Sequence, residues 1–387
     1  MMKLKQFAGV VFMAVGMMLS GAAAASSQAI PAMPTLAAKS YVLMDAATGQ
    51  VLVEHNADEA LPPASLTKLM TAYIATKEIR AGQIAESDLV TVSEKAWRTG
   101  GSRMFIEVGK QVSVDDLLHG VIIQSGNDAS VALAEHVAGS EEAFADMMND
   151  HARRLQLVNT SFGNATGLPM ENHYSSAMDM AKLARAIIYE DAEHYSIYAK
   201  KEFLWNDIRQ QNRNLLLWRD SSVDGLKTGH TEEAGYCLVA SAVRDNMRLI
   251  SVIFGARDEA SRAAETQKLL TYGFRFFENR TFYKKGETLT RTRIWKGDKQ
   301  QVAAGLQQNL TLTVPRGQAE KMTAEAVLDK AIMAPVQAGD KLGVVEIRLD
   351  GELLHSAELV ALEPVDKGGL FQRLLDTLRL FFFNLFN

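Results

Sequence analysis

Three short motifs carry residue types suited to acyl-transfer chemistry: Ser65-Leu66-Thr67-Lys68, Ser125-Gly126-Asn127 and Lys227-Thr228-Gly229. At ordinary residue frequencies, Ser-x-x-Lys or Ser-x-Asn alone should occur about once by chance in a chain of this length. All three motifs, in this order and in fitting secondary structure, should almost never occur together by chance. We therefore treat them as parts of one candidate site.

The first motif pairs a nucleophile with a base. Ser65 and Lys68 are three residues apart at the start of a predicted helix, so they share one helix face and the amine can reach the hydroxyl. The amine must first lose its proton, which requires lowering a pKa of ~10.4 by about 3 units, or roughly 4 kcal/mol. Burial and a second ammonium, for which Lys227 is the candidate, both act in that direction. The alternative is an ordinary lysine on a helix surface.

The second motif lies in a turn between two predicted helices. There the hydroxyl of Ser125 could relay a proton to the departing amine, and the amide of Asn127 could hold the substrate backbone. Because Ser-Gly-Asn-Asp is also a common helix start, Ser125 or Asn127 could instead be a helix cap.

The third motif directly precedes a predicted strand, residues 235–243, and is expected to form its neighbour at the sheet edge. An edge strand can pair with an extended peptide. Gly229 allows close backbone approach, and the backbone N–H groups of Ser65 and His230 are candidates for an oxyanion hole. The alternative is a simple strand and turn without a binding role.

The elements around these motifs indicate an α+β domain. Residues 39–54 alternate around a small turn, as a β-hairpin does. A helix is predicted from the prolines before Ser65 to Gly82. Further helices are predicted at residues 114–124, 128–139, 142–157, 176–190 and 262–279. Two strands, residues 235–243 and 247–256, follow the helical middle, so an antiparallel sheet should unite both ends of the domain.

Beyond that domain the pattern becomes short alternating runs separated by Gly and Pro. We predict a catalytic domain at residues 26–277, an all-β second domain at 278–364 and a separate tail at 365–387. The tail has one polar stripe and one apolar stripe, as an interfacial membrane helix does. A spanning helix is disfavoured, since each central charge would cost ~2.5–3.5 kcal/mol; the alternative is packing on the protein's own core. The apolar stripe consists of Leu370, Phe371, Leu374, Leu375, Leu378, Phe381, Phe382, Leu385 and Phe386.

The overall composition indicates a folded protein, and the N-terminal residues predict that it is exported. With 387 residues the chain exceeds the usual size of one core, and 47% hydrophobic with 22% charged residues is typical of globular domains. A net charge of -5 argues against nucleic acid as a partner. Residues 1–25 have the basic, apolar and small-residue order of a signal peptide, with a retained membrane anchor as the alternative. Cys237 is the only cysteine, so no internal disulfide can form.

The stretches PASLTKLMTAY, QSGNDA, NATGLP, QQNRN and VDGLKTGHTEEAGYCLVASA resemble low-molecular-mass penicillin-binding proteins of the serine D-alanyl-D-alanine carboxypeptidase family, peptidase S11 type. The resemblance covers nearly the whole chain. It implies a penicillin-recognising, serine transpeptidase/β-lactamase-like domain with helices on both faces of an antiparallel sheet. A small all-β domain and an amphipathic helix follow.

By this resemblance Ser65 is the acylated nucleophile, Lys68 its general base, and Ser125 with Asn127 the second element of the site. Arg262 is a candidate for holding the substrate's terminal carboxylate, which needs a cation. The full set of implied substrate-binding residues is Asn127, Lys227, Thr228, Gly229, His230, Arg213 and Arg262. Ala129 departs from relatives that have cysteine there, which should alter thiol sensitivity only.

The resemblance implies removal of the terminal D-alanine from peptidoglycan stem pentapeptides, with β-lactams as covalent inhibitors. The enzyme should lie in the periplasm, attached by its tail to the outer face of the inner membrane, with a homodimer left open. We expect neither a cofactor nor a metal, because the eight histidines are scattered. His173 is expected to be a structural histidine.

Three rival functions remain. A class A β-lactamase would need a Glu-x-x-Leu-Asn segment, which is absent between Ser125 and Lys227. The others are an endopeptidase that cuts cross-links and a catalytically silent wall-binding protein.

Overall fold

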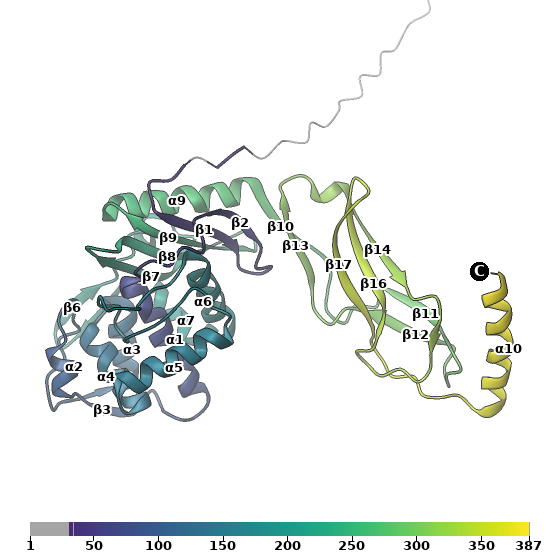
Figure 1. Cartoon of the computed structure of the whole chain (residues 1–387), viewed down its shortest axis with the longest axis horizontal. Helices are drawn as coiled ribbons and strands as arrows, with labels where there is room; N and C mark the ends of the chain where they lie inside the picture. Colours follow the sequence, from purple (N-terminus) through teal and green to yellow (C-terminus); the bar gives the residue numbers. More distant parts are fainter. Residues whose placement is uncertain (1–30, 34, 387) are drawn as a thin grey trace, which may run out of the picture. The chain divides into compact units, whose positions relative to one another are not determined.

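The computed structural model describes residues 31–33 and 35–386 (Figure 1). The predicted signal peptide, residues 1–25, lies outside the described residues.

The first domain is built on an antiparallel sheet with the strand order β2-β1-β9-β8-β7. The strands are β1 (Ser40–Asp45), β2 (Val51–His55), β7 (Val223–Thr231), β8 (Gly235–Arg244) and β9 (Met247–Ala256). The predicted N-terminal hairpin is confirmed, and β1 pairs with β9 along its whole length. The two ends of the domain therefore meet in one sheet, as predicted.

Helices cover both faces of this sheet (Figure 1). Helix α9 packs on β8 and β9 from one side, and α6 packs on β1 and β9 together with the helical group on the other. This explains why β8 and β9 are nearly continuous apolar runs and do not alternate. The helices are α1 (Lys68–Arg80), α2 (Glu94–Arg98), α3 (Val114–His119), α4 (Asn127–Ala138), α5 (Glu141–Arg154), α6 (Ala177–Glu190), α7 (Ala192–Tyr195), α8 (Leu216–Arg219) and α9 (Glu259–Phe276).

Helix α1 lies within the core, since every residue from Lys68 to Thr76 is buried. It continues a 3-10 turn, η1 (Ala64–Thr67), and the π-helical turn η2 (Gly120–Gln124) leads into α4. Short two-stranded pairs complete the domain: β3 (Leu89–Thr91) with β4 (Gln111–Ser113), and β5 (Glu202–Trp205) with β6 (Ile208–Gln211).

The second domain is all-β, as predicted, apart from a short 3-10 turn, η4 (Ala319–Lys321). Its larger sheet has the order β14-β16-β17-β12-β11-β15, and β10 pairs with β13. Its own core includes Val302, Val345, Ile347 and Leu359. The strands are β10 (Phe277–Tyr283), β11 (Thr290–Trp295), β12 (Gln301–Gly305), β13 (Leu310–Pro315), β14 (Met322–Leu328), β15 (Ile332–Met333), β16 (Lys341–Leu349) and β17 (Glu352–Ala361).

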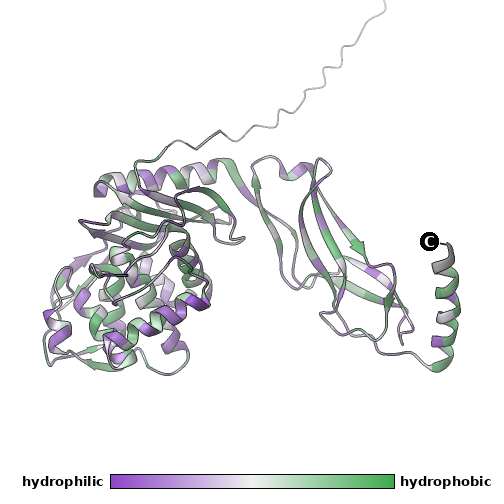
Figure 2. Ribbon diagram, viewed as in Figure 1, coloured by the Kyte–Doolittle hydropathy of each residue, from purple (hydrophilic) through white to green (hydrophobic). Residues whose placement is uncertain are grey.

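The tail forms helix α10 (Leu370–Phe386), which is largely hydrophobic in Figure 2. From Leu370 to Phe382, the side chains of its apolar stripe are not packed on a core: Leu370 is 84% exposed and Phe371 80%. The alternative that this helix buries its apolar stripe against the protein itself is therefore wrong. Within residues 31–33 and 35–386, no helix combines the length and apolar character needed to cross a membrane.

Candidate active site

Ser65 and Lys68 meet where η1 becomes α1. Ser65 lies in the 3-10 turn, Lys68 is the first residue of the α-helix, and the lysine Nζ is 3.0 Å from the serine Oγ. Lys68 is only 1% exposed, so the alternative of a surface lysine is wrong.

Two further oxygen atoms fix the amine of Lys68. Its Nζ donates to the Asn127 Oδ1 at 2.7 Å and to the Thr166 carbonyl at 2.6 Å. Burial and, second to it, the positive charge of Arg213 lower the pKa of Lys68 from 10.5 to about 7, against a smaller opposing effect of Asp128. Near neutral pH this lysine therefore exists partly as the free amine that a base must be.

The source of the second positive charge differs from the prediction. We expected Lys227 to depress the pKa of Lys68, but the principal cationic neighbour acting on Lys68 is Arg213. Lys227 is itself buried, and its pKa is lowered well below its usual value by that burial and then by Lys68, Arg213 and Arg262. The site therefore contains four basic side chains, and the two buried lysines among them are the least able to keep a proton. The four are Lys68, Lys227, Arg213 and Arg262.

Ser125 occupies an unusual backbone conformation between η2 and α4. Its φ is 65°, in the left-handed region, which is uncommon for residues other than glycine. Its hydroxyl is buried and has no hydrogen-bond partner within the described part of the chain. A strained residue with an unused buried hydroxyl is a frequent feature of catalytic sites.

Asn127 does not act as a helix cap, so the capping alternative is wrong. The N-cap of α4 is Gly126, without a side-chain cap. The Asn127 amide instead joins Lys68, through Oδ1, to the carbonyl of Gly100, to which Nδ2 donates at 2.6 Å.

Asp128 is a structural anchor that sequence reasoning missed. Its buried carboxylate accepts the backbone N–H groups of Met104 and Phe105 at 2.8 Å each, Ile106 at 3.2 Å and Ala129 at 2.9 Å. These bonds tie the 104–106 segment to the start of α4. Its position beside the Ser-Gly-Asn motif was the only signal in the sequence.

Strand β7 is the edge strand beside Ser65. Lys227, Thr228, Gly229 and His230 all lie on it, and it pairs only with β8 in the sheet order. A Cβ at Gly229 would lie 2.9 Å from the Pro63 carbonyl oxygen and 3.2 Å from the Ser65 nitrogen. The strand therefore approaches η1 as closely as glycine permits, which agrees with the predicted role of this residue.

The two predicted arginines lie next to each other. Arg262, on α9, is 3% exposed, and its Nη2 lies 3.4 Å from the backbone carbonyl of Arg213. The side chain of Arg213 is exposed. Both arginines act on the pKa of Lys227, so the structure brings these three basic side chains to the β7 side of the site.

A loop at residues 163–173 closes the other side of the Ser65–Lys68 pair and supplies the Thr166 carbonyl. The Gly163 N–H donates to the Nδ1 of His173, so Nε2 carries the proton and donates to Thr67 Oγ1 at 2.8 Å. Burial lowers the pKa of His173 to about 4, which keeps it neutral. It is thus a structural histidine, as predicted. The role of the Thr166 carbonyl was not predicted, because a backbone oxygen leaves no residue signature.

Among the described residues, no group of three or more His, Cys, Asp or Glu side chains is arranged to hold a metal ion.

Known proteins match this fold and site. The sequence profile of the D-alanyl-D-alanine carboxypeptidase family matches residues 26–258, and that of the penicillin-binding protein 5 C-terminal domain matches residues 277–367. The D-alanyl-D-alanine carboxypeptidase DacC of Escherichia coli K12 is 46% identical over 360 residues, 91% of this chain and 90% of the relative. DacA of the same strain is 44% identical over 365 residues, 92% of this chain and 91% of the relative.

Solved structures of penicillin-binding proteins are similar to this structure. Penicillin-binding protein 5 from Haemophilus influenzae has a TM-score of 0.83 and 43% identity, covering 86% of this chain and 99% of that one. Penicillin-binding protein D2 from Listeria monocytogenes, in its ampicillin-bound form, has a TM-score of 0.58 and 29% identity, covering 62% of this chain and all of that one.

The penicillin-binding protein fold and its serine site define a serine-type hydrolase. More particularly, the chain belongs to the peptidase S11 family of D-alanyl-D-alanine carboxypeptidases.

Proposed function

We propose that this enzyme removes the terminal D-alanine from peptidoglycan stem pentapeptides through an acyl-enzyme on Ser65. The observation that carries the proposal is the buried Lys68 amine, 3.0 Å from the Ser65 hydroxyl and with a pKa of about 7.

The contacts of Lys68 suit a neutral amine. Such an amine has two N–H bonds and one lone pair. Its N–H groups serve the Asn127 Oδ1 and the Thr166 carbonyl, and the lone pair then faces the Ser65 hydroxyl. The same geometry that holds the amine in place thus aims it to accept the proton of the nucleophile.

The reaction proceeds in two steps. The Ser65 oxygen attacks the carbonyl carbon between the two D-alanines while Lys68 takes its proton. The C–N bond breaks, and the departing amine receives a proton through the Ser125 hydroxyl, which releases D-alanine and leaves an ester on Ser65. Water then attacks this ester, frees the shortened peptide as a carboxylate and restores the serine.

The substrate backbone would pair with the edge strand β7. The backbone N–H groups of Ser65 and His230 would bind the oxyanion, and the cations beside β7 would bind the terminal carboxylate. The proposed carboxylate-binding groups are the basic side chains of Lys227, Arg213 and Arg262, together with the hydroxyl of Thr228. The preceding part of the stem peptide has room in a cavity of about 310 Å³ beside η1, lined by Pro63, Gly167, His173 and Thr231 among others.

β-Lactams should acylate the same serine and block the enzyme for long periods. The ampicillin-bound relative supports this expectation. Incubation with labelled penicillin should give a stable adduct on the native protein and none on Ser65→Ala. Rapid, continuing penicillin hydrolysis would instead favour the β-lactamase alternative.

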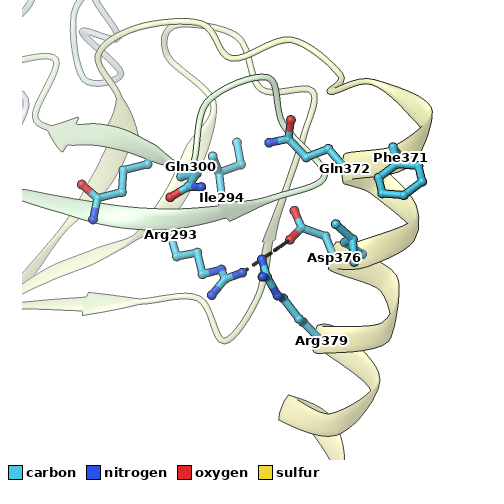
Figure 3. Close-up of a pocket in the computed structure, with 9 residues that line it drawn as sticks. Arg293, Ile294, Gln300, Phe371, Gln372, Asp376 and Arg379 are labelled. Carbon is cyan, nitrogen blue, oxygen red and sulfur yellow. Dashed lines mark hydrogen bonds and ion pairs between the residues drawn. The ribbon is translucent and has the colours of Figure 1, made fainter.

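Helix α10 should attach the protein to a membrane surface by its exposed apolar stripe. Gln372, Asp376 and Arg379 face the second domain, where Asp376 contacts Arg293 at 3.4 Å (Figure 3). Asp376 also accepts the Lys296 backbone N–H at 2.8 Å. Asp376 is 7% exposed, whereas Phe381 is 63% exposed. Docking through the polar face leaves the apolar side chains free for lipid.

With the predicted signal peptide, this attachment would place the enzyme in the periplasm on the outer face of the inner membrane. Deleting residues 368–387 should release it into the soluble periplasmic fraction. Continued sedimentation of the truncated protein with membranes would contradict the anchor.

The reaction itself is tested with a pentapeptide that ends in D-alanyl-D-alanine. The native protein should release free D-alanine and Ser65→Ala should release none. Cleavage of cross-linked dimers without release of terminal D-alanine would favour the endopeptidase alternative.

A further inference from the structure

The guanidinium of Arg262 is held by few and weak polar contacts for a buried cation. Its Nη2 lies 3.4 Å from the Arg213 carbonyl and 3.8 Å from a Glu259 carboxylate that is itself largely exposed. Both distances exceed those of strong charge-assisted hydrogen bonds. Most of its five N–H donors therefore remain available for a ligand.

An aromatic ring completes the surroundings of this guanidinium. The Arg262 Cζ lies 5.6 Å from the centre of the Tyr236 ring, within the range of a cation–π contact. The same ring packs against the imidazole of His230, with centroids 4.0 Å apart and the ring planes tilted by 32°. One tyrosine thus contacts both the proposed carboxylate-binding arginine and the proposed oxyanion-hole residue.

The sheet register explains how the three side chains meet. Tyr236 on β8 lies directly opposite His230 on β7, so both side chains project from the same face. On its other side Tyr236 pairs with Ala256, at the end of β9. The chain then turns into α9, whose N-cap is Asp258, so the first turn of α9 carries Arg262 to the ring.

An aromatic support suits a cation that must bind a carboxylate. A protein carboxylate at bonding distance would position the guanidinium equally well, but it would neutralise the charge and compete with the substrate. A ring face attracts and orients the cation while its planar N–H edge stays free.

We propose that Tyr236 is a positioning residue. It holds Arg262 in place for the terminal carboxylate of the substrate and fixes the position of this arginine relative to His230 at the end of β7. The proposal rests on the proposed function, in which Arg262 binds that carboxylate and Ser65 is acylated.

The test compares acylation of the full protein by benzylpenicillin, which carries a carboxylate, and by its methyl ester, which does not. Tyr236→Leu should slow acylation by the acid about tenfold and change acylation by the ester less than about twofold. Tenfold corresponds to ~1.4 kcal/mol, within the range of a desolvated cation–π contact. With the D-alanyl-D-alanine peptide, KM should rise while kcat changes little. Tyr236→Phe, which keeps the ring, should behave like the native protein.

Two controls separate positioning from general damage. Tyr189→Leu removes a ring that lies 5.6 Å from the Arg185 Cζ on α6, and it should leave both acylation rates unchanged. In an Arg262→Gln background, Tyr236→Leu should have almost no further effect on the acid, because its action runs through the arginine.

Equal slowing of the acid and the ester by Tyr236→Leu, or an undiminished effect in the Arg262→Gln background, would overturn the assignment while leaving Ser65 acylation intact. Absence of any adduct on the native protein would instead overturn the proposed function, and the role of Tyr236 with it.

Discussion

At the scale of single residues, the proposed mechanism makes acylation depend on the protonation state of Lys68. Below pH 7 the ammonium form predominates and cannot accept the Ser65 proton, whereas above pH 7 the free amine predominates. We expect the acylation rate constant for benzylpenicillin to rise about tenfold per pH unit below 7 and to level off above it. Stopped-flow acylation across this range measures the profile.

A matched substitution checks this assignment. Lys68→Arg keeps the positive charge but cannot lose its proton at these pH values. It should slow acylation by roughly 10²- to 10⁴-fold at every pH. A native profile that stays flat through pH 7, or an arginine variant that keeps its activity, would show that Lys68 is not the base.

Ser125 shows a conflict between stability and activity. Its left-handed backbone conformation costs a residue with a Cβ about 1–2 kcal/mol, a cost that glycine does not have. Ser125→Gly should therefore raise the free energy of unfolding by roughly 0.5–1 kcal/mol, while both Ser125→Gly and Ser125→Ala slow acylation by about 10²-fold or more.

Urea unfolding and penicillin acylation measure the two effects. Ser125→Ala is the control, because it removes the hydroxyl but keeps the Cβ and should not gain stability. If both variants kept full acylation rates, the Ser125 hydroxyl would not be the proton relay.

Single residues also show what the sequence could predict about the site. Ser65 and Lys68 were predictable because their spacing on a helix fixes their separation. The Thr166 carbonyl, 98 residues beyond Lys68, was not, because it meets the amine only through tertiary packing. Likewise the sequence indicated that Lys68 needs a cationic neighbour, but not that Arg213 is the one that acts on it.

At the scale of elements, the 163–173 loop depends on one glycine. A Cβ at Gly167 would lie 1.8 Å from the Ala64 carbonyl oxygen, and the φ of Gly167 is +84°. Gly167→Ala should push the loop away from η1 and move the Thr166 carbonyl away from Lys68. We expect acylation to slow by at least tenfold, about 1.4 kcal/mol or more in activation free energy.

Gly139→Ala is the matched control. Gly139 has a nearly equal φ of +80°, but a Cβ there would meet nothing within 4 Å. It should cost about 1 kcal/mol of stability from backbone strain and leave acylation unchanged. Equal kinetic effects of the two substitutions would show that strain alone, and not displacement of the loop, disturbs the site.

Elements were more predictable than contacts. The hairpin at β1 and β2 and the edge position of β7 follow from periodicity and from the Lys-Thr-Gly strand context, whereas the helices on both faces of the sheet were implied by the family resemblance. The α4 cap did not follow, because Asn127 has a stronger partner in the buried Lys68 than in its own helix. The propensity of asparagine to cap a helix was therefore overridden, because the Asn127 side chain binds Lys68 instead.

At the scale of the whole molecule, the tail helix has a polar face and an apolar face, and we propose a different role for each. The amphipathic pattern indicated an interfacial helix, but it could not show that the polar face has a docking partner. That partner is the β11 region of the second domain, where a largely polar cavity lies against α10 (Figure 3). Its lining includes Arg293, Gln300, Gln372, Asp376 and Arg379, together with Phe371 and Leu375 of the apolar stripe.

The two faces of α10 should therefore respond to different substitutions. Asp376→Ala leaves the Lys296 N–H without its acceptor, which costs about 1–3 kcal/mol and should undock the helix. We expect faster proteolysis between β17 and α10, with vesicle binding retained because the apolar stripe is intact.

On the apolar face, the double substitution Leu374→Glu and Leu378→Glu should abolish vesicle binding without making proteolysis faster. Glu363→Ala, which removes the ion pairs of a surface carboxylate with Lys299 and Arg291, should change neither vesicle binding nor proteolysis. If Asp376→Ala lost vesicle binding while the glutamate variant kept it, the polar face would be the membrane contact and the proposed orientation of the helix would be reversed.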